Sequence, residues 1–111
     1  MVERVHLLKL KAENANPGDR REIVDRALAV LPAVPGVLGV TAGVAADEET
    51  QKSWDIFLVV RFASLADVEP YRVHPEHRQF VDHFLGPRVE VKKGWNFDCL
   101  TTGPGGKLDP I

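Results

Sequence analysis

Residues 54–62 read WDIFLVVRF, and the architecture of the chain follows from this segment. Its centre, from Ile56 to Val60, is apolar at every position, which predicts a β-strand. A strand in an antiparallel sheet that is covered on one side normally alternates apolar and polar residues. Because this strand does not alternate, we expect the predicted sheet to be covered on both faces.

The flanking sequence predicts the order strand, helix, strand, strand, helix, strand. We expect strands at residues 2–10, 37–45, 54–62 and 88–97 and a helix at residues 17–31. In the second helical segment, a short helix at 65–71 is expected to break near Pro70, and a helix at 75–85 follows it. A hairpin loop is expected at residues 47–53, between the two middle strands. Split βαβ units in this order are typical of the ferredoxin-like α+β fold, a four-stranded antiparallel sheet with two helices on one face.

Both helical segments carry start signals. Asn16 can cap a helix whose first residue is Pro17, and Ser64 with Asp67 resembles a capping box. On the first helix the expected inward face is Ile23, Ala27, Leu28 and Leu31, with Arg20 among the outward residues.

The predicted sheet has more apolar surface than two helices can cover. Residues 2–10 also carry apolar side chains on both faces, with His6, Leu8 and Leu10 on one and Val5 and Leu7 on the other. Leaving large apolar side chains in water forfeits about 1.5–3 kcal/mol each. We therefore expect a homodimer in which two sheets meet face to face and close an α+β barrel.

Size and charge exclude several classes of protein. The 111 residues fit one domain, residues 1–100, followed by a tail at 101–111 that lacks a packing pattern. A net charge of −2 with mixed signs gives no basic surface for nucleic acid.

Residues 27–46 carry no charge, but prolines and glycines interrupt them, so we expect no membrane span. The single cysteine, Cys99, fits a reducing compartment, and we expect a cytoplasmic protein.

The chemically suggestive stretch is residues 71–84, YRVHPEHRQFVDHF, which contains the only tyrosine of the chain. Pro75 suits the first turn of a helix, so His74 is expected to cap it. At helical spacing one face then holds His77, Phe80, Val81 and Phe84, while His83 points to solvent. An imidazole in line with phenylalanines is expected to point inward.

These features resemble the stress-responsive α/β-barrel (Dabb) family. The matching segments are VHLLKLK at the first strand, LPAVPGVLGV at the end of the first helix, FASL after the third strand, and Y-x-x-HPEH, within residues 2–98. The resemblance implies a ferredoxin-like protein that dimerises into a barrel. One branch of the family includes a plant polyketide cyclase with a tyrosine–histidine acid–base pair, which implies such roles for Tyr71 and His77 and a pocket position for His6. That cyclase has another pocket histidine on its third strand, where residues 55–57 offer none.

The functional hypothesis is a cavity between the sheet and the helices. His6, Tyr71 and His77 would be catalytic, and Leu8, Phe80, Val81 and Phe84 would bind a small apolar or aromatic carbonyl compound. Histidine is a plausible base near neutral pH, and a phenol can donate a hydrogen bond to a carbonyl or enolate oxygen. No cofactor or metal is expected, because Glu76 projects away from His77 and the HExxH spacing is absent.

Several alternatives remain open at this stage. His77 could be a core histidine that is bonded only to Tyr71 or to a backbone carbonyl. Arg72 and Arg78 could orient a carboxylate or form surface salt bridges. The protein as a whole could be a non-catalytic dimer with a structural or stress-related role.

Overall fold

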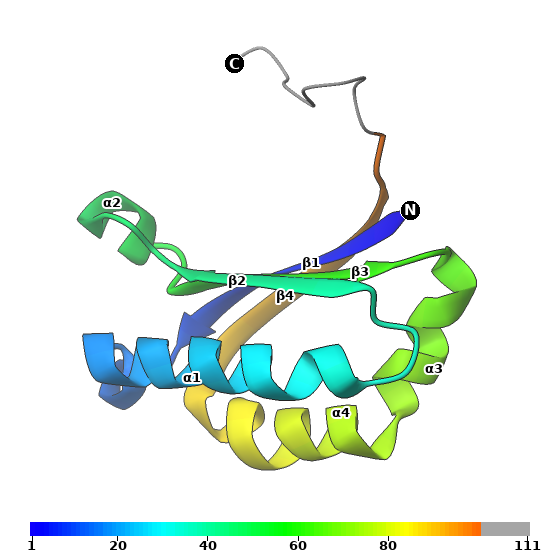
Figure 1. The fold of residues 1–111 in the computed structure, drawn as a ribbon. Helices are drawn as coiled ribbons and strands as arrows, with labels where there is room; N and C mark the ends of the chain where they lie inside the picture. Colours follow the sequence, from blue (N-terminus) through cyan, green and yellow to red (C-terminus); the bar gives the residue numbers. More distant parts are fainter. Residues whose placement is uncertain (101–111) are drawn as a thin grey trace.

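The computed structural model describes residues 1–100, and the expected tail at 101–111 lies outside the described residues. Four strands form one antiparallel sheet in the order β2-β3-β1-β4 (Figure 1). Their bounds are Val2–Leu10 for β1, Gly39–Val44 for β2, Ile56–Phe62 for β3 and Val89–Asp98 for β4. The sheet order and the helices between the strands confirm the predicted ferredoxin-like α+β fold.

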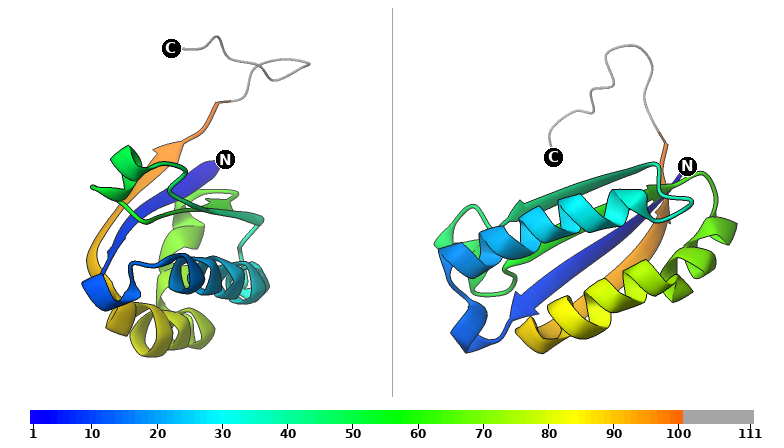
Figure 2. Two further views of the ribbon diagram at one scale, coloured as in Figure 1. Left: turned by 90° about the vertical axis from the view of Figure 1, so that its left-hand side faces the viewer. Right: turned by 60° about the horizontal axis from the view of Figure 1, so that its bottom comes forward.

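Helices α1, α3 and α4 lie on one face of the sheet, with α1 and α4 next to each other, whereas the short α2 lies at the end of the β2–β3 connection on the other side (Figure 1 and Figure 2). Their bounds are Pro17–Val30 for α1, Glu48–Gln51 for α2, Val68–Val73 for α3 and Pro75–Gln79 for α4. A π-helical segment, Phe80–Leu85, continues α4, and short 3₁₀ turns lie at Ala12–Asn14, Leu31–Ala33, Leu65–Asp67 and Gly86–Arg88. The predicted loop at residues 47–53 contains the short helix α2.

The predicted helix starts are confirmed. The Asn16 side chain accepts a hydrogen bond from the Asp19 amide at 2.8 Å, and Pro17 is the first residue of α1. Ser64 and Asp67 form the expected capping box. His74 caps α4, because its Nδ1 accepts from the Glu76 amide at 3.2 Å.

The predicted break near Pro70 was wrong, because α3 continues through Pro70 to Val73, and the break in this segment lies at His74, the predicted cap of α4. Pro70 is the third residue of α3, where a missing amide hydrogen costs nothing because the first turn has no partner for it. His74 is extended, with φ −62° and ψ 136°, because a residue before proline avoids the helical region.

The predicted sides of two residues of α1 were wrong. Leu28 was expected to face the core but is 42% exposed, whereas Arg20 was expected outside and its side chain is only 12% exposed. Arg20 is held inward by Asp55, which is fully buried just before β3 and accepts a hydrogen bond from Arg20 Nε at 3.0 Å. The same carboxylate accepts from the Leu10 amide at 2.8 Å, so it joins α1 to the sheet.

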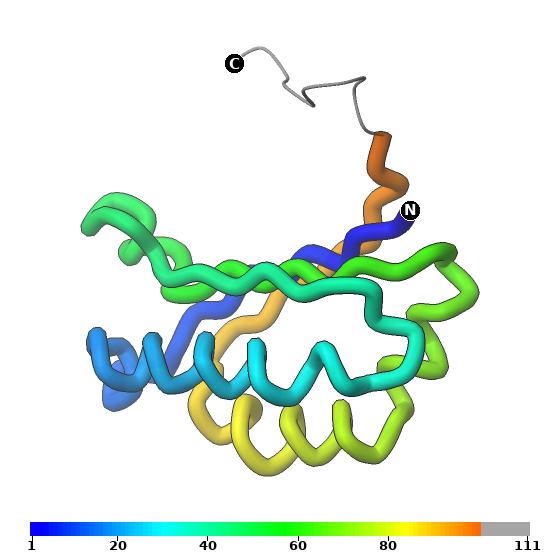
Figure 3. The backbone as a smooth tube through the Cα atoms, viewed as in Figure 1, coloured from blue at the N-terminus to red at the C-terminus, as the bar shows by residue number. Residues whose placement is uncertain are grey.

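The two faces of the sheet differ in cover. Ile56, Leu58 and Val60 of β3 are buried under the helices. The opposite face, which we call the open face, carries Val5, Leu7, Phe57, Val59, Val91, Trp95 and Phe97, as the strand registers require. No helix or strand of residues 1–100 crosses it, as the backbone trace in Figure 3 makes visible. Phe57, Trp95 and Phe97 are 41%, 46% and 52% exposed there.

Candidate functional site

A cavity of about 150 Å³ lies between the helix-bearing face of the sheet and the α3–α4 region. Its lining combines apolar side chains with imidazole, phenol and cationic groups. The lining residues are Arg4, His6, Leu8, Leu31, Leu58, Tyr71, Arg72, His77, Arg78, Phe80, Val81, Leu85 and Lys92. The apolar members are mostly buried, so the cavity has an apolar interior beside a small set of polar groups.

His77 projects from the first turns of α4 and is 8% exposed. Its Nδ1 lies 3.0 Å from the carbonyl oxygen of Arg72, the residue two before the α3–α4 break. A carbonyl oxygen can only accept, so in the neutral ring Nδ1 carries the proton. The proton-free Nε2 is thereby left as the basic atom of the ring.

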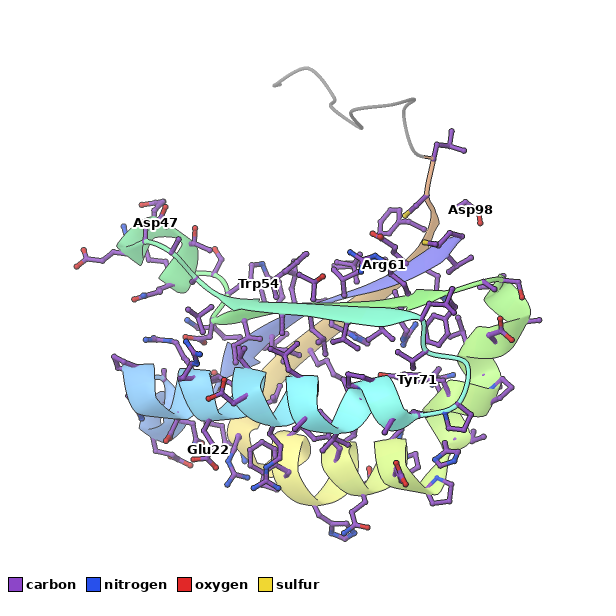
Figure 4. The ribbon with its side chains drawn as sticks, in the orientation of Figure 1. Glu22, Asp47, Trp54, Arg61, Tyr71 and Asp98 are labelled. Carbon is purple, nitrogen blue, oxygen red and sulfur yellow. The ribbon has the colours of Figure 1, made fainter. Side chains whose placement is uncertain are left out.

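Tyr71 lies in the last turns of α3 with its ring packed between Phe62 and His77. The ring centroids are 5.1 Å from Phe62 and 4.2 Å from His77. Figure 4 shows Tyr71 on the helix-bearing side of the sheet and Arg61 on the opposite side. Within residues 1–100 the His77 ring bonds to a backbone carbonyl and not to the Tyr71 hydroxyl. Burial raises the pKa of Tyr71, so the phenol keeps its proton at neutral pH.

His6 faces the same cavity from β1, directly opposite Gly94 of β4 in the strand register. Burial, together with the positive charges of Arg4 and Lys92, lowers the pKa of His6 to about 3. Burial likewise lowers the pKa of His77 to about 4, although its bond to the Arg72 carbonyl acts in the opposite direction. Both imidazoles are therefore neutral at pH 7 and able to accept a proton.

Four cationic side chains border the cavity. Arg72 pairs with Glu69 at 2.8 Å and Arg78 pairs with Asp82, which are the surface salt bridges considered from the sequence. Arg4 of β1 donates to the Asn96 side-chain amide oxygen at 2.9 Å. Lys92 of β4 lies opposite Leu8 in the register, and burial and the charge of Arg78 lower the pKa of its ammonium group.

The structure brings most of the sequence-predicted site residues to one cavity. Those that line it are His6, Leu8, Tyr71, His77, Phe80 and Val81. Phe84 does not border it. This ring stacks on Phe80 with centroids 5.7 Å apart and lies beside an open groove between α1 and the α4 region. His83, expected at the surface, is exposed along that groove.

Sequence reasoning did not assign Arg4 and Lys92 to the site. A signal for Arg4 was present, because it stands two residues before His6 and therefore on the same strand face. Lys92 gave no comparable signal, since a lysine in an alternating strand normally points to solvent. In β4 the apolar residues Val91 and Trp95 occupy the open face, which turns Lys92 toward the cavity.

Residues 1–100 contain neither a metal-ligating cluster nor a helix that could span a membrane. No three side chains of the metal-ligating types His, Cys, Asp and Glu come together in a way that could hold a metal ion. None of the helices described here has the length and apolar character needed to cross a lipid bilayer.

Comparison with solved structures shows the same fold in several proteins. A Dabb family protein with a ferredoxin-like fold from Mesorhizobium loti has a TM-score of 0.74 at 20% identity, covering 89% of this chain and 96% of its own. A dimeric ferredoxin-like protein of unknown function from Thermobifida fusca has a TM-score of 0.71 at 21% identity, covering 88% and 90%. The hydroxynitrile lyase of Passiflora edulis has a TM-score of 0.73 at 16% identity, covering 93% and 96%.

A search among curated proteins finds none that matches this sequence. The model of the family described as "Stress responsive A/B Barrel Domain" (Dabb) matches residues 2–92. That match spans most of the chain, including β1, the HPEH segment and the start of β4. The chain belongs to the stress-responsive A/B barrel domain family.

Proposed function

We propose that this protein is a homodimer that binds a small apolar or aromatic carbonyl compound in the cavity beneath its sheet and performs acid–base chemistry on it. The observation that carries the proposal is the tautomer of His77. Its Nδ1 is committed to the Arg72 carbonyl at 3.0 Å, which leaves a basic Nε2 in a ring that borders the cavity.

Each polar group of the cavity has a distinct role in this proposal. The neutral His77 ring accepts a proton from the carbon next to a carbonyl group. Tyr71 keeps its phenolic proton and donates a hydrogen bond to the oxygen, where negative charge develops. His6 completes the polar edge of the cavity from β1.

The dimer part of the proposal rests on the open face. Its exposed aromatic residues are Phe57 on β3 and Trp95 and Phe97 on β4, and Val5 and Leu7 of β1 lie between these two strands on the same face. Covering them would recover about 1.5–3 kcal/mol for each large side chain. A second copy of the chain would present the same apolar face, and the similar protein of Thermobifida fusca is described as dimeric.

The likeness to the Passiflora hydroxynitrile lyase supports an enzymatic role by fold analogy alone. The absence of disulfide-forming partners for the single Cys99 is consistent with a cytoplasmic location, which we include in the proposal.

The test is a ligand screen followed by proton exchange. Carbonyl compounds that raise the melting temperature are incubated in D₂O, and NMR follows exchange of the hydrogen next to the carbonyl. His77→Asn keeps a donor for the Arg72 carbonyl but removes Nε2, so it should retain binding and lose exchange about 100-fold or more. His83→Asn, which changes an exposed histidine nearby, should behave like the wild type.

Two results separate the candidate functions. Ligands that bind without any enhanced exchange would leave a binding protein and refute the catalytic role. A screen in which no compound stabilises the wild type would favour the non-catalytic structural dimer.

A further inference from the structure

We infer that the cavity selects an anion, namely a carbonyl compound that carries one aromatic ring and one carboxylate group, with the ring in the apolar interior and the carboxylate bound by Arg4 and Lys92. The inference rests on the proposed function, because it names the ligand class for the same cavity.

The first support is the origin of the cations. Four different elements each contribute one cationic side chain to the cavity. These are Arg4 from β1, Arg72 from α3, Arg78 from α4 and Lys92 from β4. This concentration is local, because the chain as a whole carries 14 basic and 16 acidic side chains. An excess of positive charge at one cavity of an acidic protein attracts negatively charged ligands.

The second support is the lack of countercharge. Glu69 pairs with Arg72 and Asp82 pairs with Arg78, so two of the four cations have carboxylate partners. Arg4 is bonded to the neutral side chain of Asn96, and no carboxylate of residues 1–100 forms a salt bridge with Arg4 or Lys92. The neutral His6 and His77 leave this charge unbalanced. A bound carboxylate would balance it and accept charge-assisted hydrogen bonds.

The third support is the shape of the cavity. Its apolar wall is formed by Leu8, Leu31, Leu58 and Phe80, all at most 5% exposed. The side chains of Arg72 and Arg78 are 49% and 43% exposed, which places charge at the mouth. A volume of about 150 Å³ matches a cavity that holds one benzene ring. An apolar interior behind a cationic mouth fits a ring with one anionic substituent.

The experiment compares benzoate with benzamide, its uncharged counterpart of similar size, by isothermal titration calorimetry. We expect benzoate to bind the wild type about tenfold or more tightly than benzamide, with an affinity that falls as ionic strength rises. Lys92→Gln should weaken benzoate about tenfold and leave benzamide unchanged, and Arg4→Gln should act in the same direction.

Lys93→Gln is the matched control. It removes the same charge one residue further along β4, but Lys93 pairs with Leu7 and therefore lies on the open face, away from the cavity. We expect it to change neither affinity.

Failures of the two proposals are distinguishable. Anion selection would be overturned if benzoate and benzamide bound equally tightly, or if the Lys92 and Lys93 variants lost the same amount of affinity for benzoate. Either result would leave the carbonyl-binding proposal standing. If neither probe binds while other carbonyl compounds from the screen do, the single-ring carboxylate is refuted. If no compound binds at all, the proposed function itself fails.

Discussion

The imidazole of His6 lies directly over the α-carbon of Gly94. The two residues are opposite each other in the β1–β4 register, and a β-carbon built on Gly94 would stand 2.5 Å from His6 Nε2. Real β-carbons do not approach other heavy atoms that closely. The missing side chain of Gly94 is therefore what allows His6 to occupy its place at the cavity.

Gly94→Ala should displace the His6 ring and distort the cavity. We expect a loss of about 1–3 kcal/mol in the free energy of unfolding, typical of overpacking, together with weaker ligand binding. Urea unfolding and calorimetry measure the two effects. Gly43→Ala in β2 is the control, because nothing lies within 4 Å of its β-carbon position. Equal effects of the two substitutions would contradict the positioning role of Gly94.

Asp55→Ala should destabilise the fold strongly. The carboxylate is fully buried and binds Arg20 Nε at 3.0 Å and the Leu10 amide at 2.8 Å, with Lys9 Nζ at 3.7 Å. Removing one member of a buried pair leaves the other unpaired, which costs about 3–5 kcal/mol. The control Asp25→Ala removes an exposed i,i+4 partner of Arg21 and should cost under about 0.5 kcal/mol in urea unfolding.

Stability should fall as the pH is lowered from about 6.5. The folded-state pKa values of about 3 for His6 and about 4 for His77 lie below the ordinary 6.5, so the unfolded chain takes up protons first. Each unit by which the folded-state pKa lies below the unfolded-state pKa changes the free energy of unfolding by about 1.4 kcal/mol. Urea unfolding between about pH 7 and pH 4.5 should show a shallower slope for His77→Asn than for the wild type. His83→Asn should keep the wild-type slope, and an unchanged slope in both variants would contradict the assignment.

Charge on the open face should dissociate the dimer. Phe57→Glu places a carboxylate where two sheets are expected to meet, so sedimentation velocity at micromolar concentration should shift from dimer to monomer. Leu28→Glu is a matched control, because Leu28 is 42% exposed on α1 and Phe57 is 41% exposed on the sheet. A wild-type protein that sediments as a monomer would refute the proposed dimer directly.

An anion in the cavity should raise the pKa of His77. Besides burial, the positive charges of Arg78, Lys92 and Arg4 depress this pKa, and a bound carboxylate would offset their effect. NMR titration of the imidazole signals with saturating benzoate should therefore give a pKa above its ligand-free value of about 4. With benzamide the pKa of His77 should stay nearer its ligand-free value. Equal pKa shifts with both probes would contradict the electrostatic explanation.

Local signals predicted the elements well because caps and apolar periodicity act between neighbours in the chain. The Asn16 cap, the Ser64 capping box and the Pro75 helix start all occur as expected. Arg20 was misplaced because its partner, Asp55, lies 35 residues away and is buried only after β3 pairs with β1. No local pattern reports such a contact.

The site was predicted in part for a related reason. Helical spacing placed His77 and Phe80 at one cavity, but it assumed 3.6 residues per turn throughout. The segment Phe80–Leu85 is π-helical, with more residues in each turn, so Phe84 rotates away from the face of His77. It contacts Arg26 and Arg88 instead, with the guanidinium carbons 4.6 Å and 4.0 Å from the ring centroid.

The amino-acid order by itself determined the succession of strands and helices, the inward imidazole of the HPEH helix and the apolar excess of WDIFLVV. Those properties depend on backbone preferences and periodicity within a few residues. Only the tertiary structure decided that Arg4, His6 and Lys92 meet Tyr71 and His77 around one cavity. The physical reason is that β1 and β4 come from opposite ends of the chain, and their pairing alone sets which side chains of each face the helices.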